Sequence, residues 1–435
     1  MNLFSSKNWN LPCATNNAAV QEPKNMIDHL FRHEAGKLVA ILTRLFGPHN
    51  LELAEDVVQD TLLKALEHWK YHGTPDNPSA WLFTAARNKA LDVLRREQQR
   101  KKIRPDTESE SDTTPESLIN QHPIEDEQLR MMFVCCHPAI PEEGQVALIL
   151  KTLCGFSVAE IAKPFLTNEE TITKRLYRAR QVFREEQVAF GFPTHTEMQQ
   201  RLTNVLTAVY LIFTEGYQST DHDSVVREDL IEESLRLGKM ITEHTLTSTS
   251  ESNALMALLC FQTARLAARV DHAGHLLPLK EQDRSLWNRE LIDQGNYYLN
   301  MASVGETISA YHLQAAIAQE HCAASRYEET NWKRILHWYN WLLEIKPDGL
   351  IALNRLIAFA EVHGAQAALD ELMHHPDREK LARYYLYPAV LGEWHLQLGN
   401  KTEARLYLEM AINATTSPAE KHLLQSKLNH LSRVE

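Results

Sequence analysis

The densest group of side chains that could do chemistry lies in residues 171–184, and the chemistry it suggests is binding to nucleic acid. This segment contains five lysines or arginines and no acid. Guanidinium and ammonium groups contact phosphates and the edges of bases. If the segment is helical, Ile172, Leu176 and Phe183 form a buried stripe on the opposite side. The residues expected to read DNA are Glu170, Thr171, Lys174, Arg175 and Arg178.

Two consecutive helices are expected to position this basic face. Ser157 and Glu160 have the spacing of a capping box at the start of the segment 157–165. Thr167 and Glu170 repeat that spacing at the start of the next helix. Two helices, a tight turn and a basic outer stripe are typical of a helix-turn-helix. A basic helix that only faces solvent is the alternative.

A second candidate surface lies on the segment AEDVVQDTLLKAL (54–66), which has two faces. Leu53, Val57 and Trp69 belong to an apolar stripe at helical spacing. The opposite face is acidic and could dock on a basic partner. A solvated face, with acids favoured near the helix N-terminus by the macrodipole, is the alternative. The residues expected to form the docking surface are Glu55, Asp56, Gln59 and Asp60.

The third candidate surface is the loop and helix that follow. Asn77 precedes Pro78 in the arrangement of a helix cap with a proline in the first turn. Residues 86–104 carry eight lysines or arginines against two acids. Such a helix could touch DNA, and the loop could stack on an unpaired base, although a solvated face and a plain connector would look the same. The residues expected to contact DNA are Tyr71, His72, Asn77, Trp81, Asn88, Asp92, Arg95 and Arg96.

The order of these segments resembles a known family. The segment 54–66, a short loop and NPSAWLFTAARNKALDVLRRE (77–97) are similar to region 2 of the sigma-70 superfamily, in its extracytoplasmic-function (ECF) branch. The segment TNEETITKRLYRARQVFREE (167–186) resembles region 4.2, and the stretch before it resembles region 4.1. Each motif is ordinary alone, whereas their joint order and spacing are specific.

The resemblance implies a transcription initiation factor that performs no covalent chemistry itself. It assigns Asp56, Gln59 and Asp60 to the clamp of core RNA polymerase. The loop and the helix 81–97 would open and hold the minus-ten element of promoter DNA. Region 4.2 would read the minus-thirty-five element, and region 4.1 would meet the polymerase flap. Neither a cofactor nor a metal ion is expected.

Composition divides the chain into five predicted parts. Residues 105–127 contain eight acids and no lysine or arginine, as is typical of a linker. This charge could mimic nucleic acid in a basic channel or serve only as a soluble tether. The five parts are a disordered tail (1–24), a region 2 bundle (25–104), the acidic linker (105–127), a region 4 helix-turn-helix (128–192) and a C-terminal helical domain (193–435).

The C-terminal part is predicted to be helical, and its end resembles tetratricopeptide repeats. Gly364 precedes Gly399 by 35 residues, which is close to the period of that repeat, and Ala404 and Leu408 follow at suitable offsets. An irregular helical bundle is the alternative. The balance of 22 lysines or arginines against 31 acids opposes DNA binding. It suits docking, either on the chain's own basic helices or on a protein partner.

The whole chain is expected to be an all-α, cytoplasmic protein without enzymatic activity. Only 15 glycines and 17 prolines occur in 435 residues, and this scarcity favours helices. The six cysteines lack the spacing of a metal site and are expected to be reduced. No apolar run reaches the length of a membrane span.

Two other classes of function remain open. A stand-alone helix-turn-helix regulator with a helical-repeat sensor would share the basic helix, but it has no need of the segments that resemble region 2. An interaction scaffold with a degenerate sigma-like half would not need intact basic faces. Binding to core polymerase distinguishes the sigma factor from both.

Overall fold

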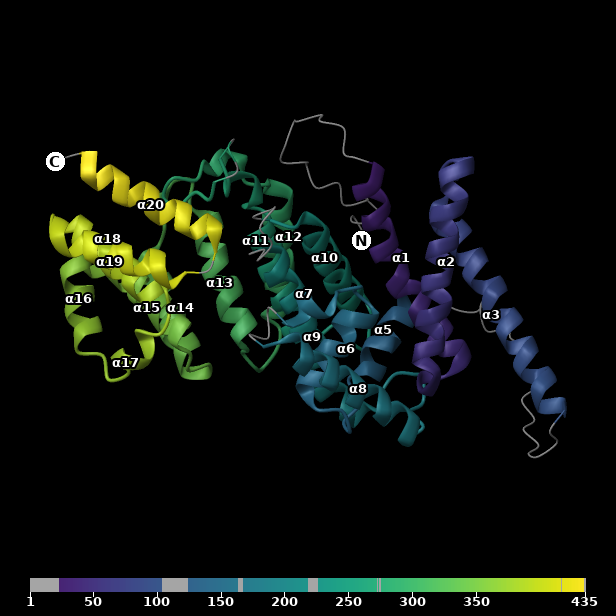
Figure 1. The fold of residues 1–435 in the computed structure, drawn as a ribbon. Coiled ribbons are helices and arrows are strands. Elements are labelled where there is room, and N and C mark those ends of the chain that lie inside the picture. The colour runs from purple at the N-terminus through teal and green to yellow at the C-terminus, as the bar shows by residue number, and fades with distance from the viewer. Residues whose placement is uncertain are drawn as a thin grey trace. The chain divides into compact units, whose positions relative to one another are not determined.

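The computed structural model of the chain is built from helices (Figure 1). Among the residues that it describes no β-strand occurs, and Val270 and Leu276 form only an isolated antiparallel bridge. The predicted tail (1–24) and linker (105–127) lie almost entirely outside the described residues. The structure describes residues 23–103, 124–162, 167–217, 226–271, 273, 275–415 and 417–433.

The chain divides into two compact units. The N-terminal unit comprises residues 27–259 and 298–312, and the C-terminal unit consists chiefly of residues 260–297 and 313–433. The predicted start of a C-terminal domain at residue 193 falls within the N-terminal unit. The domain boundaries given above therefore remain predictions.

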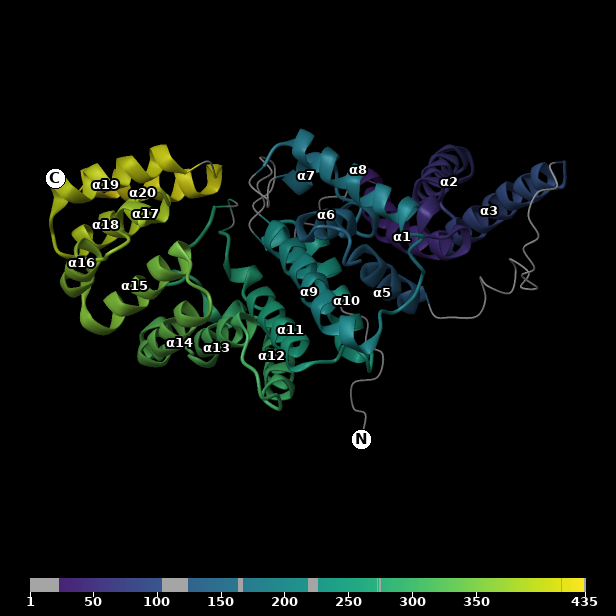
Figure 2. The same cartoon turned by 90° about the horizontal axis from the view of Figure 1, so that it is seen from below.

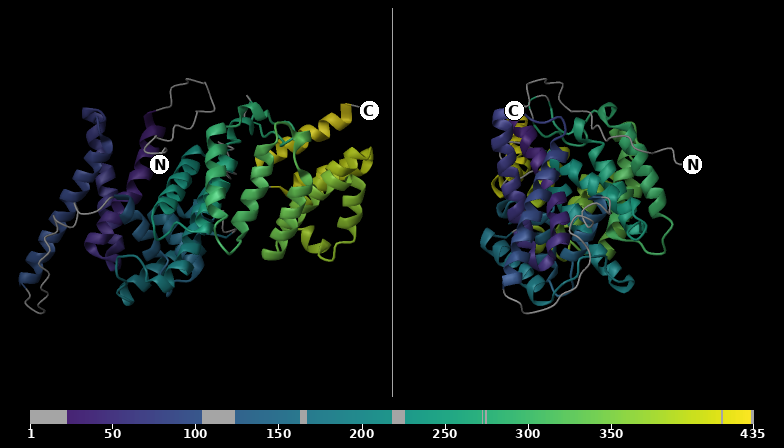
Figure 3. Two further views of the ribbon diagram at one scale, coloured as in Figure 1. Left: turned by 180° about the vertical axis from the view of Figure 1, so that it is seen from behind. Right: turned by 90° about the vertical axis from the view of Figure 1, so that its right-hand side faces the viewer.

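Three helices begin the N-terminal unit: α1 (Pro23–Phe46), α2 (Leu51–His72) and α3 (Pro78–Ile103). A short loop joins α2 and α3 into a hairpin, which Figure 3 shows as two long helices side by side. Near the loop the two helices meet at Trp69 and Trp81, whose ring centroids lie 5.6 Å apart, and Leu82 of α3 is fully buried. The predicted cap of α3 is confirmed, because the Asn77 side chain accepts a hydrogen bond from the backbone N–H of Ala80 at 3.0 Å.

The next four helices are α5 (Ile124–Cys135), α6 (Glu142–Thr152), α7 (Val158–Ala162) and α8 (Glu169–Glu185). Ser157 and Glu160 form the predicted capping box of α7, with reciprocal bonds of 2.7 and 3.1 Å. The predicted Thr167 cap of α8 is wrong. Asn168 caps this helix instead, accepting from the Thr171 N–H at 2.9 Å, because it stands directly before the first helical residue.

Two long helices follow in the same unit, α9 (His195–Tyr217) and α10 (Glu228–Glu243). Figure 2 shows α8 and α9 on either side of α6, and both contact it. The helices α11 (Ser250–Thr263), α12 (Arg289–Ala302) and α13 (Ala310–Ala323) then pass from one unit to the other.

The C-terminal unit ends in packed helix pairs, and the most extensive contacts are those of α14 with α15 and of α18 with α19. Gly364 follows α15 and Gly399 follows α18, both with positive φ, so each occupies the equivalent turn 35 residues apart. The α18 backbone at Gly392 lies against Leu408 of α19. The helices are α14 (Trp332–Ile345), α15 (Gly349–His363), α16 (Ala365–Met373), α17 (Arg378–Leu381), α18 (Leu386–Gln397), α19 (Lys401–Ala414) and α20 (Pro418–Arg433).

Two further sequence expectations concern cysteines and membranes. Every cysteine in the described part of the chain is buried and unpaired, and Cys13 lies outside it. Within that same part, no helix has the combination of length and hydropathy that crossing a bilayer requires.

Candidate nucleic-acid interface

The outward face of α2 is an exposed surface that mixes acidic and apolar side chains. Asp56, Gln59 and Asp60 are exposed, as the sequence predicts. Leu63 and Leu66, which the sequence analysis missed, are 58% and 45% exposed on the same helix. Both leucines lie outside the apolar stripe of α2, and this position could have predicted their exposure. Exposed leucines beside carboxylates are suited to contact with another protein.

Asp60 is held by a neighbouring helix. Its carboxylate forms an ion pair with Lys89 of α3. The hydrogen bond from Lys89, together with its charge, lowers the pKa of Asp60. This ion pair links the acidic face of α2 to α3.

Glu55 differs from its neighbours because α8 covers it. Arg180 of α8 donates from Nη2 to both carboxylate oxygens of Glu55, at 3.1 and 2.9 Å. One turn along α8, Arg184 reaches Glu52 at 2.5 Å. Burial raises the pKa of Glu55, and Arg180 opposes that shift without reversing it. The predicted exposure of Glu55 is therefore wrong, because a helix 125 residues away in sequence packs over it.

The last turn of α2, just before the loop to α3, presents an aromatic residue to solvent. Tyr71 is 78% exposed and His72 is exposed at the end of α2. Asn77 is also exposed, but its side chain caps α3. Trp81 is half-buried, with its ring centroid 5.6 Å from that of Trp69. Tyr71 is thus available for stacking, whereas Trp81 anchors α3 on α2.

The outward face of α3 is open and polar. Asn88, Asp92, Arg95 and Arg96 are all exposed. Asp92 and Arg95 approach each other to 3.7 Å in an exposed pair, which is weak in water. The two arginines can therefore turn toward a phosphate backbone.

The predicted reading residues of α8 divide into two groups. Glu170, Lys174 and Arg178 are exposed, and Lys174 pairs with Glu170 at 2.6 Å. Thr171 is half-buried and its backbone N–H is bound to the cap. Tyr177 is exposed beside Arg178 and was missed by the sequence analysis, since it follows a buried leucine without any pattern of its own.

Arg175 does not share the open face. Its side chain is three-quarters buried and lies 3.7 Å from Glu143 of α6. The prediction that Arg175 points outward with Lys174 and Arg178 is wrong, because this position borders the buried stripe of α8. The open face of α8 includes Glu170, Lys174, Tyr177 and Arg178.

A carboxylate on α7 ties three segments together. Glu160 accepts from Arg227, just before α10, at 2.6 Å and from Arg32 of α1 at 3.4 Å. Burial would raise the pKa of Glu160. The hydrogen bonds from Ser157 and Arg227, with the nearby charge of Arg32, outweigh burial and lower it to about 2. The carboxylate is therefore ionised at neutral pH and holds both arginines.

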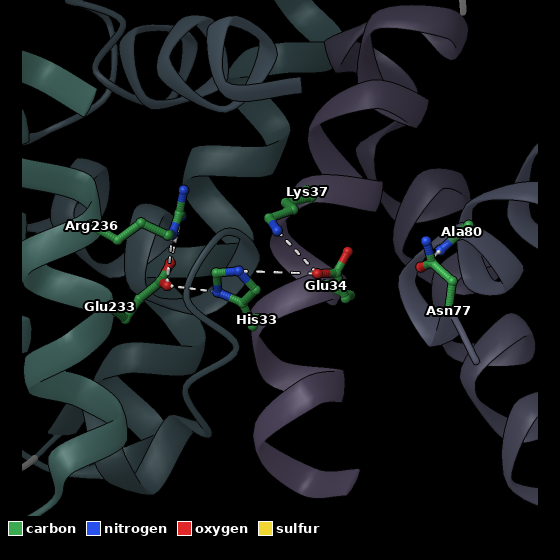
Figure 4. A network of polar contacts seen from close by, with 7 residues as sticks. All are labelled: His33, Glu34, Lys37, Asn77, Ala80, Glu233 and Arg236. Carbon is green, nitrogen blue, oxygen red and sulfur yellow. Dashed lines mark hydrogen bonds and ion pairs between the residues drawn. The ribbon is translucent and has the colours of Figure 1, made fainter. Parts of the chain in front are cut away.

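A second junction joins α1 directly to α10 (Figure 4). Glu233 lies between His33, at 3.0 Å, and Arg236, which donates two hydrogen bonds of 3.0 and 2.8 Å. Burial opposes ionisation of Glu233, but these hydrogen bonds dominate and lower its pKa to about 2. Nearby, Gly36 of α1 leaves no room for a side chain, since a Cβ there would lie 1.8 Å from the Leu153 carbonyl oxygen.

The helix α9 covers α5 and α6. Asn204 donates to Gln145 at 2.5 Å, and Arg201 donates to the Phe133 carbonyl at 3.4 Å. Phe192, in the segment between α8 and α9, packs against Phe133 and against His244 just after α10. The stretch that resembles region 4.1 is thus packed against the helices that come after it.

Family models match three parts of the chain. Sigma-70 region 2 matches residues 30–100, and Sigma-70, region 4 matches residues 130–182. A family of unknown function (DUF6596) matches residues 201–303. The first two matches contain the α2, α3 and α8 surfaces described above.

Relatives of the chain fall into two kinds. An uncharacterized protein of Rhizobium meliloti (strain 1021) is 34% identical over 388 residues, which cover 88% of this chain and 91% of that protein. The ECF RNA polymerase sigma factor SigL of Mycobacterium tuberculosis is 30% identical over 34% of this chain and 82% of its own length. The ECF RNA polymerase sigma factor SigE of Mycolicibacterium smegmatis is 28% identical, over 36% of this chain and 60% of its own length. No solved structure matches the chain with significance.

Proposed function

The chain belongs to the ECF branch of the sigma-70 family, with a long C-terminal extension, and from this premise we propose which surfaces serve which step of initiation. As a member of this family it is a transcription initiation factor that binds core RNA polymerase and promoter DNA. Three exposed surfaces of the N-terminal unit are candidates for these contacts.

The outward face of α2 is proposed to bind the polymerase clamp. Asp56, Gln59 and Asp60 offer acceptors to a basic partner, and Leu63 and Leu66 offer apolar area beside them. This combination of exposed leucines and carboxylates is the observation that carries the proposal, because apolar area beside acceptors is suited to contact with a basic protein surface.

The two basic faces are proposed to read the promoter. Tyr71 and the Asn88–Arg96 face of α3 would hold the opened minus-ten element, where an unpaired base can stack on an exposed aromatic ring. Lys174, Tyr177 and Arg178 of α8 would contact the minus-thirty-five element in a groove. Base contacts would come from Lys174 and Arg178, and the later Arg180 and Arg184 would bind phosphates once they are released from Glu55 and Glu52.

The extension is proposed to regulate these surfaces by holding the N-terminal unit closed. Arg180 and Arg184 cover the acidic start of α2, and α9 covers α6 in the part proposed to meet the polymerase flap. Glu160 and Glu233 connect this arrangement to the residues around α10. In this proposal core polymerase competes with α8 for α2, so the closed arrangement is inhibitory.

Charge reversal on α2 tests the core-binding proposal. Asp56→Arg with Asp60→Arg is expected to abolish association with core polymerase, because both positions would present cations to a basic partner. Binding is measured with purified core in a pull-down, and circular dichroism checks the helix content. The matched control is Glu403→Arg with Glu409→Arg, two exposed acids of α19 with the same change of charge. Equal capture of core by the α2 variant and the wild type would refute this assignment.

A further inference from the structure

Two arginines of the C-terminal unit lie together without a counter-ion. Arg284 is 5% exposed, and Arg265 is half-buried just after α11. Their guanidinium carbons lie 4.9 and 5.2 Å from the ring centroid of Trp287, so both cations approach the same indole. Cation–π contact stabilises each arginine, but it does not neutralise two charges that repel each other.

The hydrogen-bond partners of Arg284 are all neutral. Its Nη1 donates to the carbonyls of His321 and Ala324, both at 2.9 Å, and its Nη2 donates to the Thr330 hydroxyl at 3.0 Å. Within the described residues, no carboxylate lies within ion-pair distance of either Arg265 or Arg284. An unpaired buried charge is costly, so a cluster with one buried and one half-buried arginine calls for an explanation.

The acids closest in sequence to the cluster have other partners. Glu320, beside His321 on α13, is 2.9 Å from Arg334. The Asp283 side chain accepts from the Ser285 backbone N–H at 2.9 Å. Neither carboxylate therefore serves as a counter-ion for Arg265 or Arg284.

Several buried polar atoms of the cluster have no partner. They are the Nε atoms of Arg265 and Arg284, Nε1 of Trp287 and Nδ1 of His321. Burial and the two arginines lower the pKa of His321 to about 3, and burial together with Arg265 lowers the pKa of Arg284. Burial is the largest cause of both pKa shifts, and the neighbouring guanidinium charges add to it. The unused N–H groups are donors from which an oxyanion can accept hydrogen bonds.

We propose that Arg265, Arg284 and Trp287 form a binding site for a small molecule that carries a carboxylate or phosphate group. The oxyanion would supply the missing counter-charge and accept from the unused Nε and Nε1 donors. Arg284 is already fixed by three hydrogen bonds, so the site is partly organised before the ligand arrives. This inference concerns the C-terminal unit and does not depend on the assignment of the polymerase and promoter surfaces.

Thermal unfolding of the full-length protein tests the site. Sodium phosphate, glycerol 3-phosphate and sodium succinate are titrated separately at constant ionic strength, against sodium chloride. At least one oxyanion is expected to raise Tm by several degrees in a saturable manner, because a ligand that binds only the folded state stabilises it. The phosphate, phosphate-ester and dicarboxylate arms identify the group that the site prefers. No saturable shift with any of the three would overturn the proposal.

The variant Arg265→Gln separates binding from a structural role. The side chain of Arg265 makes no hydrogen bond or ion pair among the described residues, and its removal relieves repulsion with Arg284. Without oxyanion, the variant is expected to unfold at or above the wild-type Tm, and it should lose the oxyanion-dependent shift. Arg326→Gln, at an exposed arginine paired with Glu329, is the control and should keep the shift. A lower Tm without oxyanion, or a shift equal to that of the wild type, would contradict a binding role.

Discussion

Arg175 and Arg178 lie one turn apart on α8 but have different surroundings. Arg178 is exposed, whereas Arg175 is largely buried against Glu143. If α8 reads the upstream promoter element, the exposed side chain can enter a groove of DNA without rearrangement. The buried one contributes chiefly to the packing of α8 on α6.

Substitution of these two arginines should therefore have different effects. Arg178→Ala is expected to weaken promoter binding by the holoenzyme by about 1–3 kcal/mol and to relax selectivity within the minus-thirty-five element. Arg175→Ala should instead lower thermal stability and leave promoter selectivity close to the wild type. Selection from a randomised upstream element, alongside thermal unfolding, measures both. A loss of selectivity confined to Arg175→Ala would reverse the assignment.

Exposure could be predicted from the sequence for residues whose position around a helix, relative to the apolar stripe, is enough to determine it. Asp56, Asp60, Lys174 and Arg178 point outward because each lies opposite an apolar stripe. Glu55 and Arg175 could not be placed in this way, because residues far along the chain cover them. The arginine pair at Trp287 carries no recognisable spacing, and only folding brings Arg265 and Arg284 together.

At the scale of the element, the α2–α3 hairpin combines a rigid base with an exposed tip. Trp81 packs against Trp69, and its ring centroid lies 5.4 Å from that of His68, so α3 is fixed to α2 near the loop. Tyr71 projects from the same region with most of its surface in solvent. The hairpin can thus present one aromatic ring to DNA while another holds its structure.

The two aromatic residues should respond differently to alanine. Tyr71→Ala is expected to change the stability by less than about 0.5 kcal/mol, as for most surface substitutions, but to impair opening of the minus-ten element. Trp81→Ala should cost on the order of 2–4 kcal/mol, since it removes a large side chain from the packing of the hairpin. Chemical denaturation measures the stability, and permanganate reactivity of promoter thymines measures opening. Normal opening with Tyr71→Ala would show that the loop is only a connector.

The presence of helices was predicted more reliably than the residues that cap them or the helices that pack against them. The α7 capping box and the Asn77 cap of α3 were predictable because they are local patterns of three or four residues. Asn168 was missed as the cap of α8 because Thr167 offered a competing pattern one residue earlier. The packing of α9 on α6 depends on contacts about 60 positions apart in sequence, such as Asn204 to Gln145, which no local pattern encodes.

At the scale of the whole molecule, the closed N-terminal unit joins the proposed DNA-reading helix to the proposed polymerase-binding helix. Arg180 and Arg184 hold α8 on α2, and Glu160 and Glu233 tie the arrangement to α10. The unit would have to open for α2 and α8 to reach separate targets. In the proposed function, the extension would therefore affect core binding through a conformational equilibrium.

Removal of the two arginines should shift that equilibrium toward the open state. Arg180→Ala with Arg184→Ala leaves Glu55 without its charged partner, and loss of such hydrogen bonds costs roughly 1–3 kcal/mol in the closed state. The apparent affinity for core polymerase is then expected to rise about tenfold, because a larger fraction is competent to bind. Fluorescence anisotropy with labelled protein measures this affinity.

The control for this experiment removes two exposed cations from the C-terminal unit, Arg326→Ala with Lys380→Ala. Its affinity for core should match that of the wild type. Weaker binding by the Arg180 and Arg184 variant would indicate that the closed arrangement supports polymerase binding. Unchanged binding would show that the contact has no regulatory effect.

Transcription in vitro with purified core RNA polymerase tests whether this chain directs promoter-specific initiation as a sigma factor. The full-length protein is added to core on a library of promoter fragments, and the transcript start sites are sequenced. We expect initiation that depends on the added protein, from fragments that share one minus-ten and one minus-thirty-five sequence at fixed spacing. Core polymerase could instead give the same transcripts with and without the protein, under conditions in which the protein binds DNA alone. That result would contradict the sigma-factor assignment and favour a stand-alone helix-turn-helix regulator.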